Sequence, residues 1–238
     1  MNFHNRSWVD RALNLVYPEN IYCMRCHDVI DSSRAHGLCD DCVLQIPWAT
    51  DNPFSSYMDE FAFDDVWSVT RYGTHVRGMI HGLKLHGETY IAKNLGALMA
   101  ERLLMEECAI DILTAVPLHK DKLRLRGFNQ AALLGEYIAQ GTGIVFLPGI
   151  LIKPEPTPSL RLADSRTRRH ILTGAFSVPE EYLKSVAGHH IVLVDDVCTT
   201  GTTADACAQA LKCAGAVRVT LLCFAASAGY RTESVDES

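Results

Sequence analysis

The sequence predicts an α/β protein, with a mainly parallel sheet covered by helices on both faces and a small module of four cysteines before it. Beyond residue 65, short apolar runs alternate with segments of helical periodicity, which is the pattern of βαβ units. Two CxxC pairs lie close together before that point. The 238 residues suffice for one sizeable α/β domain with a small appendage, but they are too few for two fused enzymes.

The first part of the α/β region contains two predicted strands and, between them, two predicted helices. Residues 66–72 and 112–118 are apolar runs of strand length. Over residues 76–83 and again over 91–103, apolar side chains recur every three or four positions, which places them on one face of a helix. The helix positions are Val76, Met79, Ile80 and Leu83, followed by Ile91, Leu95, Leu98, Met99 and Leu103.

The second part continues the alternation, with a predicted helix over 128–138 and a predicted strand over 144–152. Residues 191–194 are four consecutive apolar residues, typical of a strand that is buried on both faces. A helix that ends at Gly215 follows, and residues 217–224 form the last strand. The helix positions are Phe128, Ala131, Leu134 and Ile138, followed by Ala204, Cys207, Leu211 and Ala214.

Charge divides the chain near residue 65. Residues 1–65 carry four basic and eleven acidic side chains, a sum of −7, so the net charge of −6 leaves +1 for residues 66–238. A polar, turn-rich stretch over residues 50–56 is the best linker candidate. We therefore predict an N-terminal domain over residues 1–65, with an N-terminal helix and the cysteine module, and an α/β domain over residues 66–238.

The composition excludes several classes of protein. With 28 acidic against 22 basic residues, the chain is not a polycation that coats nucleic acid, and any contact with DNA must be local. The longest nearly apolar run, residues 219–228, is too short to span a membrane. The first eighteen residues lack an apolar core that leads to a small-residue cleavage site. We therefore expect a cytoplasmic protein with no membrane span.

The two CxxC pairs predict a zinc site. They are separated by twelve residues, and at that spacing four thiolates can close a tetrahedron around Zn²⁺. A closed site leaves no position for water, so the metal would support folding and not chemistry. Either of two nearby histidines, His27 or His36, could replace a thiolate. The predicted ligands of this zinc-ribbon-like module are Cys23, Cys26, Cys39 and Cys42.

Residues 191–203 are the most informative stretch. The apolar strand ends in two adjacent carboxylates, Asp195 and Asp196, and a loop of small hydroxylic residues around Gly201 then opens the next helix. Backbone N–H groups at a helix N-terminus converge on phosphate, and the carboxylates are suited to accept hydrogen bonds from sugar hydroxyls. No GxxxxGK[ST] or GxGxxG motif occurs on a matching strand and helix, which disfavours NTPases and dinucleotide-binding enzymes.

These thirteen residues resemble the ribose-phosphate motif of type I phosphoribosyltransferases. The resemblance implies that the paired acids hold the ribose 2′ and 3′ hydroxyls of PRPP, that the TTGTT loop holds its 5-phosphate, and that Mg²⁺ accompanies the ligand. It also implies a type I phosphoribosyltransferase-like sheet. The PRPP-binding residues implied in this way are Asp195, Asp196, Cys198, Thr199, Thr200, Gly201, Thr202 and Thr203.

A wider resemblance covers nearly the whole chain. Besides the cysteines and the DDV-TTGTT loop, it includes the Val-Pro-Leu motif at 116–118, the segment RLRGFNQ at 124–130 and Gly-Ala-Phe at 174–176. Together these residues resemble the ComF/GntX family. That family combines a zinc-finger-like N-terminus with a phosphoribosyltransferase fold, and its members are associated with DNA uptake in naturally competent bacteria.

The resemblance also gives two basic segments a role. In related folds the loop after the Val-Pro-Leu strand binds pyrophosphate, and residues 119–130 contain four cations before the next predicted helix. The alternative is a solvated basic loop. Four arginines over residues 161–169 would either close over PRPP or form a nucleic-acid patch. The candidates for binding pyrophosphate are Lys84, Leu118, His119, Lys120, Arg124 and Arg126.

Two functions remain open at this point. The first is an enzyme that transfers the 5-phosphoribosyl group of PRPP to a nitrogen nucleophile with the assistance of Mg²⁺, although no general base is evident. The second is a non-catalytic sensor of PRPP or a nucleotide that binds single-stranded DNA, or DNA-uptake or recombination proteins. A zinc adapter with a decayed second domain is the weakest alternative, because the phosphate loop is complete.

Overall fold

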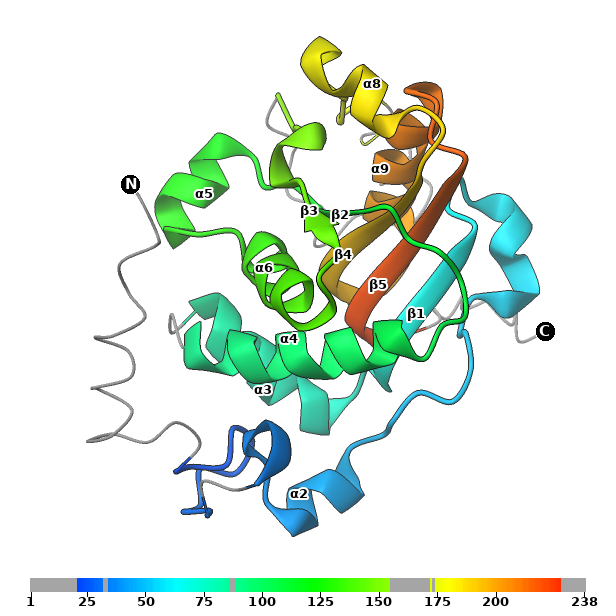
Figure 1. Ribbon diagram of the computed structural model, residues 1–238. Helices are drawn as coiled ribbons and strands as arrows, with labels where there is room; N and C mark the ends of the chain where they lie inside the picture. The colour runs from blue at the N-terminus through cyan, green and yellow to red at the C-terminus, as the bar shows by residue number, and fades with distance from the viewer. Residues whose placement is uncertain (1–20, 32–33, 86–88, 155–171, 173, 228–238) are drawn as a thin grey trace, which may run out of the picture.

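The computed structural model describes residues 21–31, 34–85, 89–154, 172 and 174–227. The strands form one five-stranded sheet in the order β1-β5-β4-β2-β3, with every neighbouring pair parallel (Figure 1). The predicted α/β class with a parallel sheet is confirmed. The strands are β1 (Asp65–Arg71), β2 (Ile112–Ala115), β3 (Val145–Phe146), β4 (His190–Cys198) and β5 (Arg218–Ala226).

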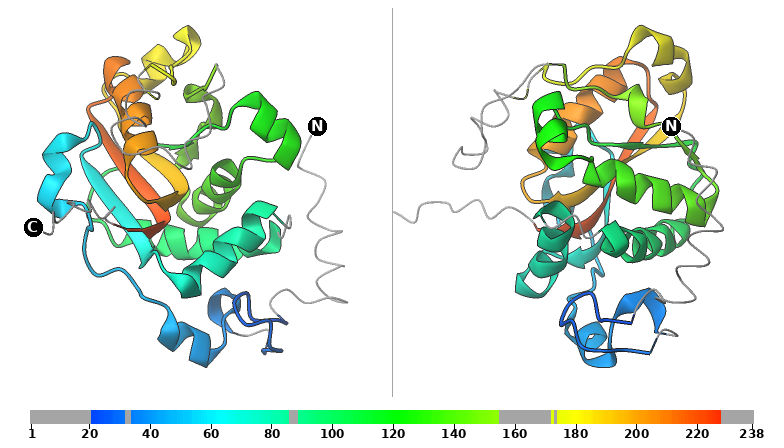
Figure 2. Two further views of the ribbon diagram at one scale, coloured as in Figure 1. Left: turned by 180° about the vertical axis from the view of Figure 1, so that it is seen from behind. Right: turned by 90° about the vertical axis from the view of Figure 1, so that its left-hand side faces the viewer.

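Helices cover both faces of this sheet, as predicted. On one face Val192 and Val194 of the central strand share an apolar cluster with residues of α3, α4 and α6. On the other face, Ile191 and Leu193 share an apolar cluster with residues of α9. The left view of Figure 2 shows the molecule from behind. Among the helices of the described residues, none has the length together with the hydropathy that a bilayer crossing requires. The α-helices are α2 (Asp40–Gln45), α3 (Thr74–Leu85), α4 (Thr89–Leu104), α5 (Lys120–Arg126), α6 (Gln130–Thr142), α8 (Leu183–Val186) and α9 (Thr202–Cys213).

Two strands are shorter than predicted, and a proline limits each of them. β2 ends at Ala115 because Pro117 has no backbone N–H to donate to a neighbouring strand. β3 comprises two residues instead of nine, because Pro148 begins a 3₁₀ turn, Pro148–Ile150. The apolar content of both segments is high enough for a strand, but the backbone cannot continue the ladder.

β4 is longer than the four apolar residues that predicted it. Its parallel pairing with β5 continues as far as Cys198, opposite Ala226. Asp195 and Asp196 therefore lie within the central strand and not after it. Their backbone is fixed by the sheet, which gives these two side chains defined directions.

The basic segment that the sequence suggests as a loop is the helix α5. His119 caps its N-terminus, because the ring Nδ1 accepts a hydrogen bond from the N–H of Asp121 at 3.3 Å. Gly127, with φ of 83°, ends the helix in the left-handed conformation. The Lys, Leu and Arg residues between the two ends are good helix formers. The cations are therefore spaced around a helix.

The chain before β1 runs along the free edge of the sheet. Ala49 donates its N–H to the carbonyl of Val69 at 3.0 Å, and Arg71 donates to the carbonyl of Pro47 at 2.7 Å. This short antiparallel contact occupies part of the edge of β1. An edge that is already paired is protected from pairing with another chain.

The residues that follow reach the opposite face. Ile46 belongs to the apolar cluster under α3 and α4, whereas Phe54 and Phe63, both nearly fully buried, belong to the cluster under α9. Residues 47–63, which we call the strap, thus join the two faces around β1. The predicted linker over residues 50–56 contributes a core phenylalanine, and the domain boundary at residue 65 stays a prediction.

Candidate functional site

A small pocket lies at the carboxyl end of β4. Its volume is about 100 Å³, and its wall is the loop between β4 and α9. Because α9 begins directly after Gly201, the loop presents its backbone at a helix N-terminus, where the N–H groups favour an anion. Seven of the eight residues predicted to bind PRPP line this pocket. The lining consists of Asp195, Val197, Cys198, Thr199, Thr200, Gly201, Thr202, Thr203 and Ala204.

The paired carboxylates do not share one environment. Successive side chains of a strand point to opposite faces, so Asp195 lines the pocket, whereas Asp196 is 4% exposed and is not part of the lining. The Oδ1 of Asp195 accepts the N–H of Asp196 at 2.9 Å. Of the two carboxylates, Asp195 is the one placed toward a ligand in the pocket. A shared role of the pair toward ribose stays a prediction.

Two features of the structure require glycine at position 201, its backbone conformation and the close approach of Phe61. Its φ of 71° lies in the left-handed region that L side chains rarely adopt. A Cβ built at this position would lie 2.9 Å from a ring carbon of Phe61, closer than real contacts allow. On the other flank, the hydroxyls of Thr200 and Thr202 are hydrogen-bonded at 3.0 Å. The glycine thus lets an aromatic side chain of the strap support the loop.

Asp205 is a residue of this site that the sequence pattern does not reveal. Its carboxylate is 2% exposed and accepts two hydrogen bonds, from the N–H of Ala62 at 2.8 Å and from the amide of Gln209 at 3.1 Å. Its own N–H donates to the carbonyl of Gly201 at 2.8 Å. An Asp in the first turn of a helix is common for electrostatic reasons alone, so nothing in the sequence indicates a partner in the strap.

The thiols around the pocket are not activated. Cys198 lies next to a helix N-terminus, where the dipole can lower the pKa of a thiol, so the sequence leaves open a minor redox role. In the structure the thiol is 4% exposed, and this burial, together with the nearby Asp195, raises its pKa well above the ordinary value. Burial also raises the pKa values of Cys207 and Cys223. All three are neutral at physiological pH and serve as small apolar side chains.

The residues proposed for pyrophosphate follow β2, the strand beside β4. The N–H of Val116 donates to the carbonyl of Val194 at 2.9 Å, so the chain leaves both strands at the same edge of the sheet. Leu118 is half-buried and His119 is 4% exposed. The helix that follows exposes its charges to solvent. Of the candidates on it, Lys120 and Arg124 are exposed and Arg126 is half-buried, and none of the group lines the β4 pocket.

Two further predicted elements have no described geometry. Lys84 lies in the last turn of α3, and only its backbone is described. The four arginines at 161, 166, 168 and 169 lie outside the described residues. Their roles toward PRPP or nucleic acid stay predictions.

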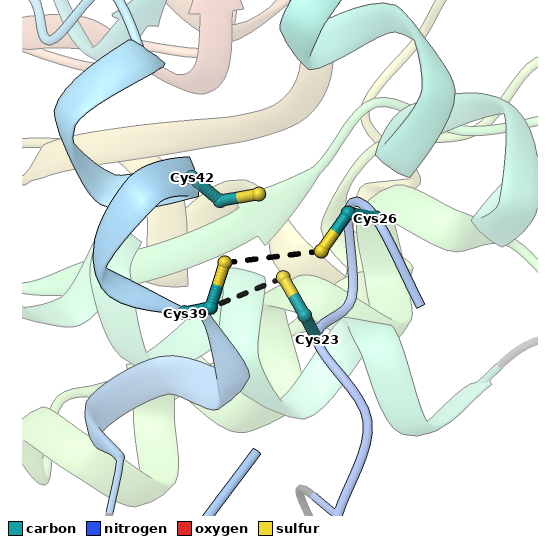
Figure 3. Close-up of side chains that lie close together, drawn as sticks. All are labelled: Cys23, Cys26, Cys39 and Cys42. Atoms are coloured by element: carbon teal, nitrogen blue, oxygen red, sulfur yellow. Dashed lines mark hydrogen bonds between the residues drawn. The ribbon is translucent and has the colours of Figure 1, made fainter. Parts of the chain in front are cut away.

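The four predicted zinc ligands come together. Their Sγ atoms all lie within 4.8 Å of one another, and the close-up in Figure 3 shows the side chains converging on one point. A tetrahedron with metal–sulfur bonds of about 2.3 Å has sulfur–sulfur edges of about 3.8 Å. The distance between the Sγ atoms of Cys26 and Cys39 is 3.8 Å. The donor set and its spacing therefore fit Zn²⁺. Neither candidate histidine belongs to the cluster, and His36 instead contacts Glu101 on α4 at 3.2 Å.

Hydrogen bonds favour ionisation of one thiol of this cluster, Cys23, whereas the pKa values of Cys26 and Cys42 are raised, with burial contributing to both. Burial opposes ionisation of Cys23, but backbone N–H groups of Cys26, Cys39 and Arg25 donate to its sulfur and lower its pKa to about 6. The guanidinium of Arg25 donates to the Sγ of Cys42 at 3.3 Å. The same guanidinium also contacts His75 of α3. The thiol cluster is thereby joined to the first helix of the α/β region.

Comparisons with known proteins found a family model, relatives and solved structures similar to this chain. A family model described as "Phosphoribosyl transferase domain" matches residues 143–237, which include β4, the pocket loop and α9. The DNA utilization protein YhgH of Salmonella typhi is 31% identical over 161 residues, covering 66% of this chain and 69% of that protein. Competence protein F of Haemophilus influenzae is 25% identical over 221 residues, covering 89% and 93%. The solved glutamine PRPP amidotransferase of B. subtilis aligns with 55% of this chain and 25% of its own, at 24% identity and a TM-score of 0.37.

Proposed function

Since this chain belongs to the ComF family of competence-related proteins with a phosphoribosyltransferase-like domain, we propose that it binds PRPP in the β4 pocket and acts in DNA uptake. The observation that carries the proposal is the pocket itself. Eight residues of the contiguous motif 191–203 line it, among them the carboxylate of Asp195 and the residues at the N-terminus of α9.

The chemistry of the lining suits the two halves of a ribose phosphate. The N–H groups and hydroxyls of the loop would hold the 5-phosphate, where the dipole of α9 stabilises negative charge. Asp195 would accept hydrogen bonds from a ribose hydroxyl, a contact that is charge-assisted. The cations that follow β2 would lie toward the diphosphate. Mg²⁺, bound mainly by oxygens of PRPP, would neutralise the charge that develops on the leaving group.

The reaction that fits this arrangement is transfer of the phosphoribosyl group to a nitrogen nucleophile. The loop and Asp195 would fix the ribose ring, and the basic residues after β2 would stabilise the departing pyrophosphate. Among the described residues, the lining of the β4 pocket has one carboxylate and no imidazole, so these residues offer positioning and electrostatic stabilisation in place of a dedicated base. An acceptor that is nucleophilic without deprotonation therefore suits the site best.

Pyrophosphate release tests the transfer. The protein is incubated with PRPP, Mg²⁺ and a panel of nucleobases and amines. We expect pyrophosphate release that depends on one class of acceptor, because the proposed site would bind PRPP and the acceptor would come from the panel. PRPP binding by calorimetry without pyrophosphate release from any acceptor would favour the sensor over the enzyme. A protein that does not bind PRPP would contradict both.

We propose the exposed face of α5 as a contact for single-stranded DNA. Lys120, Lys122 and Arg124 are exposed on it, and positive charge that outnumbers negative charge over a short span attracts the phosphate backbone. The helix follows the strand next to the β4 pocket, so PRPP and DNA should compete for the same cations. DNA-uptake or recombination proteins remain further partners of the proposed role.

The double variant Lys120→Ala/Arg124→Ala should weaken binding of a labelled oligonucleotide by about tenfold at low salt, because two phosphate contacts are lost. Fluorescence anisotropy measures the affinity for the oligonucleotide, with salt and PRPP as competitors. The matched control is Arg71→Ala/Lys184→Ala, which removes the same two charge types from exposed positions elsewhere. Equal affinities of the two double variants would contradict a contact through α5.

We also propose that the four cysteines hold one Zn²⁺ with a structural role. The convergence of four sulfurs and the lowered pKa of Cys23 support this proposal. A closed Cys₄ site has no open coordination position, so the metal would stabilise the fold around it and take no part in the transfer.

A further inference from the structure

A second and larger pocket lies between the cysteine module and α3. Its volume is about 530 Å³, which is within the range of about 300–1,000 Å³ that is usual for small-molecule sites. Three separate segments form it, namely residues 24–27, the face of α3 from Thr74 to Gly82, and Ile91 of α4. It shares no lining residue with the β4 pocket. Figures 1 and 2 show α3 between the dark blue N-terminal segment and the sheet.

The lining of this α3 pocket is cationic. Among the residues that the structure describes, it contains two arginines, Arg25 and Arg77, two histidines, His27 and His81, and no Asp or Glu. The guanidinium of Arg25 is held in place, because it donates to Gln45 at 2.9 Å and to the Sγ of Cys42 at 3.3 Å and also contacts His75. Arg77 is exposed, and its guanidinium makes no hydrogen bond or ion pair with any part of the chain that the structure describes. Such a group is available to bind an anion.

Two glycines inside α3 line the pocket. Gly78 and Gly82 lie one turn apart on the side that lines the pocket. A Cβ built on Gly78 meets no atom within 4 Å, so packing does not exclude a larger residue. Glycine in a helix interior is destabilising relative to alanine. The helix thus contains a residue that weakens it, and what that residue provides at this point is open space beside Arg77.

We propose that the α3 pocket binds a nucleotide. Its phosphate would lie against Arg77 and Arg25, near the N-terminal half of α3, where the helix dipole also favours negative charge. Its sugar or base would cover the apolar floor formed by Met24 and Ile91, both nearly fully buried. The ligand is either a free mononucleotide or one nucleotide of a strand. The site is separate from the proposed PRPP site.

Calorimetry with three probes tests this proposal: thymidine monophosphate, the oligonucleotide (dT)8 and inorganic phosphate. Arg77→Gln removes the charge, and Gly78→Leu fills the space while favouring the helix, so it should fold. Each should weaken binding of a nucleotide probe by about tenfold or more, through loss of a charge-assisted contact or of the pocket volume. The control Arg102→Gln removes an arginine of α4 that lies outside the lining and should leave the affinity within about twofold.

The probes distinguish the sources of the ligand. If binding of thymidine monophosphate depends on Arg77 and Gly78, the ligand is a free nucleotide. If only the binding of (dT)8 depends on these residues, the ligand is one nucleotide of a strand. The Asp195→Asn/Asp196→Asn variant should retain this binding, so that failure of the PRPP proposal would not affect it. Affinities unchanged in both α3 variants would overturn the proposal, and so would a wild-type protein that binds none of the three probes at millimolar concentration.

Discussion

Replacing Asp195 and Asp196 together with asparagine should lower the affinity for PRPP by about 100-fold or more, while the protein stays folded. A hydrogen bond to a charged group contributes about 1.5–3 kcal/mol, and two such bonds from ribose hydroxyls, with Asp195 as the acceptor in the pocket, would account for this loss. Asp195 lines the pocket, and the neighbouring carboxylate is fixed by the same strand. Calorimetry with PRPP and Mg²⁺ measures the affinity, and thermal unfolding verifies the fold.

The matched control removes an adjacent acidic pair elsewhere. Glu180→Gln/Glu181→Gln changes the net charge equally, in an exposed 3₁₀ turn before α8 and β4. The turn precedes β4, and the pocket lies at the carboxyl end of this nine-residue strand. Because the extended strand separates the two places, this control should leave PRPP binding unchanged. If the folded Asp195→Asn/Asp196→Asn variant bound PRPP as tightly as the control, the two acids would have no role in binding PRPP.

The second large effect concerns the thiol cluster. Cys39→Ser should remove the bound metal and lower Tm by about 10 °C or more, because structural zinc contributes about 10–16 kcal/mol in small modules. Met24, Leu38 and Ile46 share an apolar cluster with α3 and α4, so loss of the site also loosens packing on that face. Elemental analysis and calorimetry measure the two effects. Limited proteolysis should cut within residues 21–46 before it cuts the sheet.

Cys213→Ser provides the control for this variant. Cys213 is exposed at the end of α9 and does not belong to the cluster, so its replacement should leave both metal content and Tm unchanged. Pure wild-type protein that contains neither zinc nor another metal would contradict the assignment. So would a Cys39→Ser protein that retains its metal and its Tm.

The features that the sequence predicted are those encoded in short contiguous segments. The apolar run 191–194 predicted the central strand, and the residues after it predicted the lining of the β4 pocket, since a loop keeps its own residues together. The CxxC spacing likewise brings four sulfurs to one place. In both cases residues that are close in the sequence supply the site, and at the β4 pocket the strap then supports the loop through Phe61.

The features that were missed depend on contacts between distant segments or on single residues at helix ends. The carboxylate of Asp205 contacts the N–H of Ala62 across 143 positions of the chain, and no periodicity encodes such a pair. The arginines of the α3 pocket face one space only after the cysteine module has packed. The side chain of His119 caps the N-terminus of α5, which is a helix and not the loop that the sequence suggested. This helix start was missed because histidine is not among the usual capping residues.

Within the five-stranded sheet, the first strand pairs with the last one, and the strap meets part of its other edge. β1 lies at one edge of the sheet, beside β5, and the N–H of Val219 donates to the carboxylate of Asp64, 155 positions earlier, at 2.7 Å. During synthesis, β1 therefore leaves the ribosome long before its partner exists, and closing so large a loop is slow. A chain arrested before residue 218 carries an apolar strand with an unsatisfied edge. Such an intermediate invites aggregation, and chaperone dependence of the nascent chain should end only when β5 has emerged.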